Sequence, residues 1–207
     1  MKKFLMTLAL SATAFAALAA QPTTDDARSL VEQQAKTVFT NLNANQARYQ
    51  SDPAAFSALI RNEVLPYMDF ELMSQVVLGR HWREANAQQK IDFTAAFRDL
   101  LVRVYSRGWT NYAGTPVEEA VKVLSATPVD KYQRTDTRIQ VRDKNGKQAI
   151  VVFSLRFKNG QWKIYDVSFE NVSILSSYRN SFDSEINQGG LDKLIAKIKT
   201  MKGDEKL

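Results

Sequence analysis

Two Asn-Gly pairs, Asn145-Gly146 and Asn159-Gly160, frame a run of β-branched and aromatic residues at 148–157. Asn-Gly is the strongest short-range signal for a tight hairpin, because both residues tolerate the positive φ that a type I′ turn requires. The run is therefore predicted to be the middle strand of an antiparallel meander, with strands at 137–143 and 162–169 on either side.

The middle strand is apolar on both faces over part of its length. By the two-residue period of a strand, one face carries Ala149, Val151, Phe153, Leu155 and Phe157. The other face carries Ile150 and Val152. In a sheet with one solvated face, apolar and polar residues would alternate more regularly along the strand. A second layer is therefore expected to cover this strand. We expect the face that carries Val151, Phe153 and Leu155 to line a pocket.

The N-terminus has the pattern of a secretory signal peptide. Two lysines precede an apolar stretch at 4–18, which ends in an A-x-A cleavage pattern at 17–19. We predict that residues 1–19 are the signal peptide, with cleavage after Ala20 as the alternative. Residues 20–207 are then expected to form a single exported α+β domain.

Composition and charge exclude several classes of function. The chain has no cysteine, which excludes disulfides, thiolate nucleophiles and thiolate metal sites. Its formal net charge is +6, which becomes +4 without Lys2 and Lys3. In an exported protein this basic excess fits anionic lipid surfaces or acidic proteins better than nucleic acid. We therefore expect an exported protein with no nucleic-acid partner.

Helical periodicity surrounds the strands in the sequence. Helices are predicted at 27–42, 53–67, 70–78, 87–112 and 174–187, with a last one from Leu191. Asp69 is predicted to cap the helix at 70–78 and Ser173 the helix at 174–187. The predicted apolar faces include Val38, Phe39 and Leu42 in the first helix and Phe56 and Ile60 in the second. A fourth strand is predicted at 121–127. Helices first, a meander next and helices last form an α+β arrangement in which a curved antiparallel sheet packs with several helices.

The titratable residues offer little for catalysis. His81 is the only histidine and is predicted to lie on the surface of a basic loop, with Glu84 as its only acidic neighbour in sequence. Asp166 lies near the centre of the last predicted strand and would permit acid–base chemistry only if it faced a pocket. The chain has no phosphate-binding glycine loop and no nucleophile elbow. We predict no catalytic residues, no metal and no cofactor.

The apolar surface of the longest predicted helix is wider than one flat layer requires. One interpretation is a plain core in which these side chains pack only against one another. The other is a cavity for an apolar ligand between the helix and the curved sheet. The candidate lining residues are Val76, Val77, Phe97, Leu101, Tyr105, Trp109, Val151, Phe153, Leu155 and Tyr165.

Several motifs together resemble a known family. They include Leu65-Pro66-Tyr67-Met68-Asp69, Val77-Leu78-Gly79-Arg80-His81-Trp82, Gly160-Gln161-Trp162 and Val172-Ser173-Ile174. With these motifs the chain resembles the periplasmic phospholipid-binding proteins of the Mla (maintenance of lipid asymmetry) pathway, also called the toluene-tolerance family. One departure is Asn171, where the family usually has Gly. Because Asn also tolerates positive φ, we expect the turn there to be kept.

The resemblance implies a sheet similar to the nuclear-transport-factor-like cone and favours the cavity over the plain core. It implies a monomeric carrier that moves phospholipid, as cargo, between an outer-membrane lipoprotein complex and an inner-membrane ABC transporter complex. The acyl chains are expected between the long helix and the sheet, with the headgroup near solvent and weakly selected. A cone-fold enzyme and a periplasmic chaperone or lipoprotein carrier stay open as alternatives.

Overall fold

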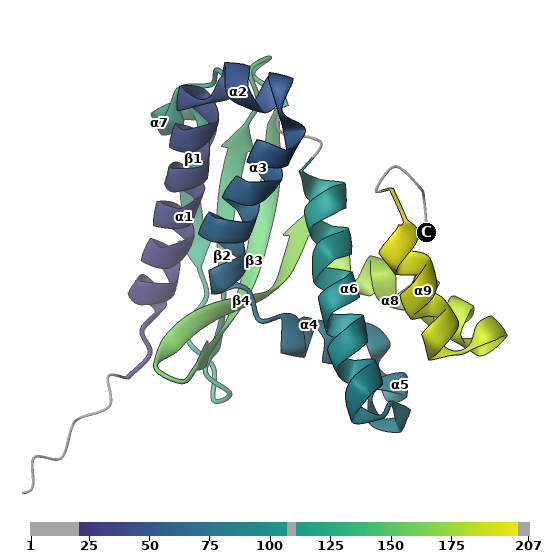
Figure 1. Ribbon diagram of the computed structural model, residues 1–207. Helices are drawn as coiled ribbons and strands as arrows, with labels where there is room; N and C mark the ends of the chain where they lie inside the picture. The colour runs from purple at the N-terminus through teal and green to yellow at the C-terminus, as the bar shows by residue number, and fades with distance from the viewer. Residues whose placement is uncertain (1–20, 107–110, 203–207) are drawn as a thin grey trace, which may run out of the picture.

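The computed structural model describes residues 21–106 and 111–202 (Figure 1). The predicted signal peptide, its cleavage site and Trp109 lie outside the described residues. The described chain is an α+β structure whose five strands form one curved antiparallel sheet in the meander order β1-β2-β3-β4-β5. The predicted fold class is confirmed.

The elements follow the predicted order closely. The helices are α1 (Thr24–Ala44), α2 (Gln46–Ser51), α3 (Pro53–Leu59), α4 (Phe70–Leu78), α5 (Arg80–Glu84), α6 (Ala87–Tyr105), α7 (Val117–Ala120), α8 (Ile174–Gly189) and α9 (Leu191–Thr200). Two short turns, η1 (Ile60–Val64) and η2 (Leu65–Tyr67), link α3 to α4. The strands are β1 (Val121–Ala126), β2 (Arg134–Arg142), β3 (Gln148–Lys158), β4 (Gln161–Phe169) and β5 (Val172–Ser173).

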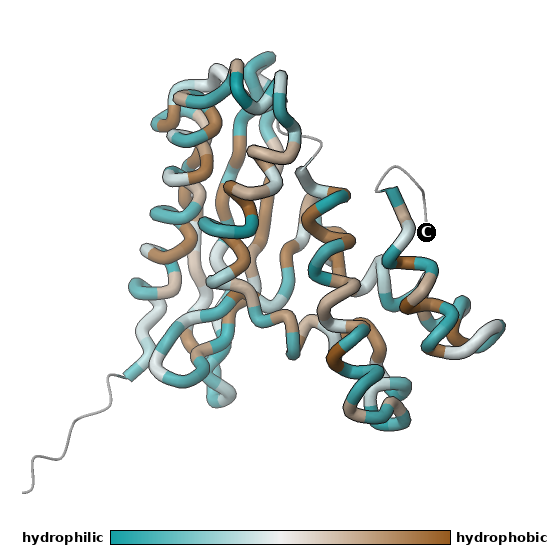
Figure 2. The backbone as a smooth tube through the Cα atoms, in the orientation of Figure 1, coloured by the Kyte–Doolittle hydropathy of each residue, from teal (hydrophilic) through white to brown (hydrophobic). Residues whose placement is uncertain are grey.

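These elements form two lobes that lie side by side in Figure 1. In the sheet lobe, α1 packs across one face of the sheet, and α2 and α3 fold back beside it. In the helical lobe, α4, α5, α6, α8 and α9 pack against one another. In Figure 2, hydrophobic segments recur along α1 and along the strands beside it, as an interface between the two layers requires.

The core of the sheet lobe lies between α1 and the predicted apolar face of β3. Ala27 and Val31 of α1 belong to the same buried cluster as Ile139 and Leu155 of the sheet. Val151, Phe153 and Phe157 pack against this cluster from the same face of β3. The two-residue period groups these residues on one face, as predicted, but that face, expected to line a pocket, packs for much of its length against the core below α1.

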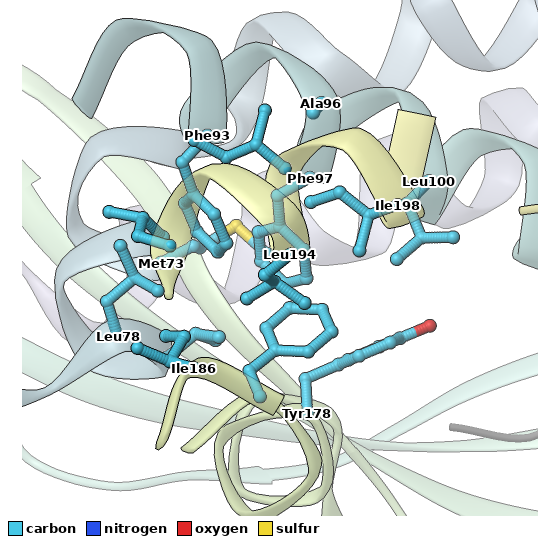
Figure 3. Packing of buried hydrophobic residues seen from close by; sticks show 14 of the residues in the cluster. Met73, Leu78, Phe93, Ala96, Phe97, Leu100, Tyr178, Ile186, Leu194 and Ile198 are labelled. Atoms are coloured by element: carbon cyan, nitrogen blue, oxygen red, sulfur yellow. The ribbon is translucent and has the colours of Figure 1, made fainter. Parts of the chain in front are cut away.

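The helical lobe has a separate aromatic core (Figure 3). Phe93 and Phe97 of α6 are 0% exposed. The Phe97 ring centroid lies 5.4 Å from that of Tyr178 and 5.9 Å from that of Phe182, both on α8, in edge-to-face geometry. Ile198 of α9 closes the same cluster. The wide apolar surface of α6 is thus buried mainly by other helices.

Helix α6, the longest predicted helix, differs from its prediction in length and in partner. It was predicted at 87–112 but ends at Tyr105, with Ser106 as its C-cap. Its N-terminal capping box is present, because Asn86 and Gln89 exchange side-chain and backbone hydrogen bonds. Periodicity identifies an apolar face but not the element that covers it, and here α4, α8 and α9 take the place expected of the sheet.

The predicted turns are partly confirmed. Asn159 and Gly160 both have positive φ, 53° and 78°, as a two-residue type I′ turn requires. At the other hairpin only Gly146 has positive φ, and its N–H donates to the carbonyl of Asp143 at 3.0 Å. The Asp143 carboxylate stabilises this longer loop by accepting from two backbone N–H groups. Asn171, which stands where the family usually has Gly, has φ 65°. It therefore adopts the positive φ that was expected of the turn.

Asp69 joins the two lobes. Its Oδ1 accepts from the Leu72 N–H at 3.1 Å and caps α4, as the sequence predicted, and its Oδ2 is paired with Arg156 of β3. Its own N–H donates to the Ile164 carbonyl of β4 at 2.8 Å. Burial raises the pKa of this carboxyl, but the Arg156 and Leu72 hydrogen bonds outweigh burial and hold the pKa below its ordinary value.

We predict that Asp69→Asn lowers the free energy of unfolding by about 2–3 kcal/mol at pH 7, because Asn keeps the helix cap but loses the ion pair. The folded pKa of Asp69 is lowered, so its contribution is present above the unfolded pKa of about 3.9 and is lost as the pH falls through the folded value. Urea unfolding of both proteins at a series of pH values from 7 downward measures the difference in their unfolding free energies.

The exposed Asp136 of β2 provides the control, since Asp136→Asn should change stability little at any pH. A difference between Asp69→Asn and wild type that stays constant down to pH 2 would contradict the ion-pair assignment.

Candidate functional site

An apolar cavity of about 840 Å³ lies between the helical layer of the sheet lobe and the sheet, bordered by the end of α6 and the start of α8. It is lined by Val38, Phe39, Leu42, Phe56, Ile60, Val104, Tyr105, Tyr112, Val141, Val151, Val167, Phe169, Glu170, Val172, Ile174 and Ser177. Most of these side chains are aliphatic or aromatic, so the cavity suits an apolar ligand with few hydrogen-bonding demands.

The cavity is open to solvent at an apolar rim. Tyr105, Phe169 and Val172 line it and are 51%, 47% and 62% exposed. Large apolar side chains that gather in one exposed place mark a binding surface more often than scattered ones do. A ligand that enters the cavity would cover these three residues.

The tyrosines of the cavity wall are neutral. Burial, together with the nearby Tyr178 and Asp166, raises the pKa of Tyr105 well above its ordinary value. Burial and the nearby Asp143 carboxylate also raise the pKa of Tyr112. An ordinary tyrosine is already neutral at physiological pH, and these shifts keep both hydroxyl groups uncharged to still higher pH.

The structure brings only part of the predicted site together. Tyr105 and Val151 lie on the cavity wall. Three other predicted residues, Val77, Phe97 and Leu101, are buried in the helical core, and Val76 packs against that core.

The remaining predicted residues lie around the sheet. Leu155 is 0% exposed in the sheet core, and Phe153 packs against the same core. Tyr165 occupies a β-bulge of β4 and packs against the helical core, with the guanidinium carbon of Arg134 5.5 Å from its ring centroid. Trp109 lies outside the described residues.

Sequence reasoning missed the contribution of the first helices. Val38, Phe39 and Leu42 of α1, Phe56 of α3 and Ile60 of η1 all line the cavity. Their spacing marks them only as the apolar faces of two helices and does not connect them with a cavity. The π-helical turn η1 widens the helix at Ile60, and such turns are common at functional sites, but nothing in the local sequence distinguishes it from a regular helix.

Asp166 has a structural role in this fold. Its Oδ2 accepts from the Ser173 hydroxyl at 2.5 Å, and its Oδ1 accepts from the Leu175 N–H at 3.3 Å. Ser173 is the N-cap of α8, as predicted, so the carboxylate positions the start of that helix against β4. Asp166 is not among the cavity-lining residues, which weighs against the acid–base role that the sequence left open.

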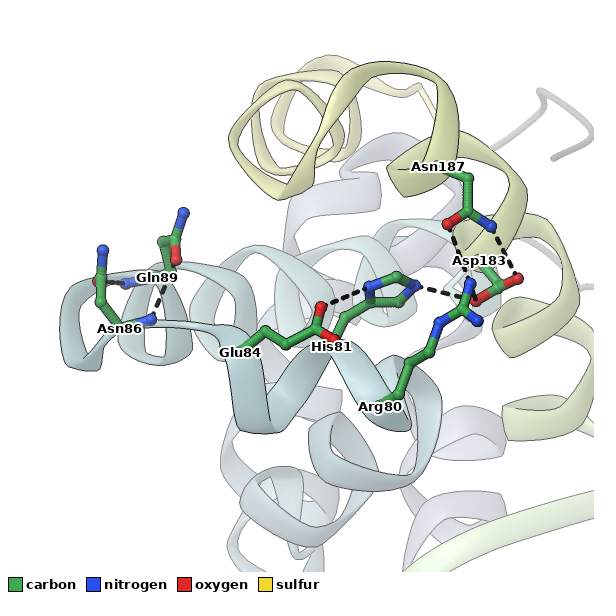
Figure 4. Close-up of polar contacts among 7 residues, drawn as sticks. All are labelled: Arg80, His81, Glu84, Asn86, Gln89, Asp183 and Asn187. Atoms are coloured by element: carbon green, nitrogen blue, oxygen red, sulfur yellow. Dashed lines mark hydrogen bonds and ion pairs between the residues drawn. The ribbon is translucent and has the colours of Figure 1, made fainter.

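His81 differs from its prediction, because it is buried in α5 and not exposed in a loop. Its Nε2 lies 2.9 Å from Asp183 Oδ1 of α8, and its Nδ1 lies 3.4 Å from Glu84 Oε2 (Figure 4). Arg80 donates to Asn187 at 3.0 Å beside them. The His81 hydrogen bond, with the nearby Arg80 charge, lowers the pKa of Asp183. This network holds α5 against α8.

Within residues 21–106 and 111–202, no cluster of three or more His, Cys, Asp and Glu side chains could hold a metal ion. No helix in the same part of the chain has the length and apolar character needed to cross a membrane.

Comparison with known proteins identifies the family. The model of the MlaC protein family matches residues 32–200. This chain belongs to the MlaC family. It is 28% identical over 172 residues to the intermembrane phospholipid transport system binding protein MlaC of Haemophilus influenzae, a match that covers 82% of this chain and 78% of that protein. It is 24% identical over 158 residues to the toluene tolerance protein ttg2D of Pseudomonas putida, covering 75% and 71%.

A solved structure has the same fold. The phospholipid-binding protein of Ralstonia solanacearum, determined in complex with a phospholipid, superposes with a TM-score of 0.75 at 21% identity. The match covers 84% of this MlaC-family chain and 94% of that chain. At this identity the likeness supports the fold.

The two aromatic environments make a testable contrast in this MlaC-family protein. Phe97→Ala should lower the unfolding free energy by about 3–5 kcal/mol, since it leaves a void in a close-packed core. Phe169→Ala should cost about 1 kcal/mol or less, because the ring is half exposed at the cavity rim. Chemical denaturation of lipid-free protein measures both. A loss for Phe97→Ala of only about 1 kcal/mol would contradict its place in the core.

Proposed function

We propose that this protein is a periplasmic phospholipid carrier, which buries acyl chains in the cavity between α1, α3 and the sheet. It moves as a monomer between the outer-membrane lipoprotein complex and the inner-membrane ABC transporter complex of the Mla pathway, without catalysing a reaction. The observation that supports this most strongly is the open cavity of about 840 Å³ with mostly apolar walls. Membership of the MlaC family supports the same role.

The energetics of burial favour a carrier that holds its cargo firmly. Each methylene group removed from water contributes about 0.8 kcal/mol. Two chains of roughly sixteen carbons would contribute on the order of 20 kcal/mol before ordering costs. Release into water is then negligible, and transfer needs an apolar surface on a partner. This is the behaviour required to cross an aqueous compartment between two membranes.

The proposal gives different roles to the residues of the cavity wall and to those of its rim. Val38, Val151 and Val167, from α1, β3 and β4, would contact the acyl chains. The rim residues Tyr105 and Phe169 would lie nearer the glycerol backbone, with the headgroup toward solvent. This differs from the sequence-based expectation, because α6 contributes only Val104 and Tyr105 at its C-terminal end.

We predict that Val151→Arg lowers the amount of phospholipid bound, because a charged side chain in the cavity must be desolvated or must displace the acyl chains. Wild-type protein purified without detergent should carry phospholipid, and native mass spectrometry measures the occupancy of each form.

Leu124→Arg is the matched control, because Leu124 is 42% exposed on β1 and does not line the cavity. It should retain wild-type occupancy. Folded wild-type protein that carries no phospholipid, or that carries a protein-linked acyl group, would contradict the proposed function. Full occupancy of Val151→Arg would contradict the location of the site.

A further inference from the structure

A carboxylate stands at the solvent-exposed end of the cavity. Among the described lining residues, Glu170 carries the only formal charge. Glu170 is exposed and lies in the chain between Phe169 and Val172, the exposed apolar residues of the rim. The charge is therefore placed where a lipid with buried chains would present its headgroup.

The carboxylate is held in position by the backbone of β3. The Glu170 N–H donates to the Ile150 carbonyl at 3.0 Å, and the Ile150 N–H donates to Glu170 Oε1 at 2.7 Å. The β4–β5 turn fixes the same residue, since Glu170 and Asn171 have φ of 48° and 65°. Glu170 Oε2 has no hydrogen-bond partner among the described residues. One oxygen thus anchors the group, and the other is available to a ligand.

Phospholipid headgroups differ in the charge that they would bring to this carboxylate. All carry a phosphate, but an ethanolamine headgroup adds an ammonium group and is neutral overall. A glycerol headgroup adds no positive charge and stays anionic. A fixed carboxylate attracts the ammonium group and repels the anionic headgroup.

We infer that Glu170 biases the cargo toward zwitterionic, amine-bearing phospholipids and against anionic ones. This inference rests on the proposed function, because it concerns the headgroup of a lipid held in the same cavity. The rim is exposed, so the bias is modest, on the order of two- to fivefold, as for a solvent-exposed ion pair. It refines the weak headgroup selectivity that the apolar walls predict.

Glu170→Gln isolates the charge, since its amide oxygen can still accept from the Ile150 N–H and keep the turn. Lipid-free wild-type and variant proteins are incubated with vesicles of equal phosphatidylethanolamine and phosphatidylglycerol with identical acyl chains. The protein is recovered and its bound lipids are quantified by mass spectrometry. Wild-type protein should bind phosphatidylethanolamine in about two- to fivefold excess, and Glu170→Gln should bind the two lipids equally.

Glu118→Gln makes the same change in net charge on α7, away from the cavity, and should keep the wild-type ratio. The wild-type ratio should also fall toward one at about 1 M salt, where the Debye length is about 3 Å. This measurement tests the charge without any variant.

Lipid uptake with the same ratio in wild type and Glu170→Gln, or a wild-type ratio that salt does not change, would overturn this inference alone. Failure of the wild-type protein to take up either lipid would overturn the proposed function, and this inference with it.

Discussion

The helices of the helical lobe bury their apolar faces against one another, and this packing leaves part of the sheet uncovered. Phe93 and Phe97 are 0% exposed inside that core, so the same face of α6 cannot also cover the sheet. On the sheet lobe, α1 covers one face only in part, and Val151 and Val167 face a cavity of about 840 Å³. The cavity therefore exists because the two lobes pack separately and leave part of the apolar face of the sheet uncovered.

Buried polar groups position the lobes and perform no chemistry in this account. Asp69 links the start of α4 to β3 through Arg156, and Asp166 links β4 to the start of α8 through Ser173. Within the helical lobe, His81 links α5 to Asp183 of α8 in the same way. Removing one partner of such a pair leaves a buried group unsatisfied, so these contacts make the junction specific. Because the end of α6 and the start of α8 border the cavity of the sheet lobe, the relative position of the lobes determines the shape of that cavity.

Local signals in the sequence predicted local structure well. The Asn159-Gly160 turn, the Asp69 and Ser173 caps and the grouping of apolar residues on one face of β3 all depend on a few adjacent residues, and the structure has them. The partner of α6 depends on long-range packing, which periodicity does not encode. For this reason Phe97 is predicted to line the cavity, while Val38 is predicted only as part of the apolar face of a helix. Resemblance to the family predicted that a cavity exists but not which residues line it.

Photo-crosslinking with a phospholipid that carries a diazirine near the end of one acyl chain tests the central claim most directly. The lipid is bound to the intact protein, activated by light, and its adducts are mapped by peptide mass spectrometry. If the cavity between α1, α3 and the sheet holds the acyl chains, adducts will concentrate around Val38–Leu42 and at Val151 and Val167. Adducts concentrated at Phe93 and Phe97 would place the lipid in the helical lobe and contradict this account.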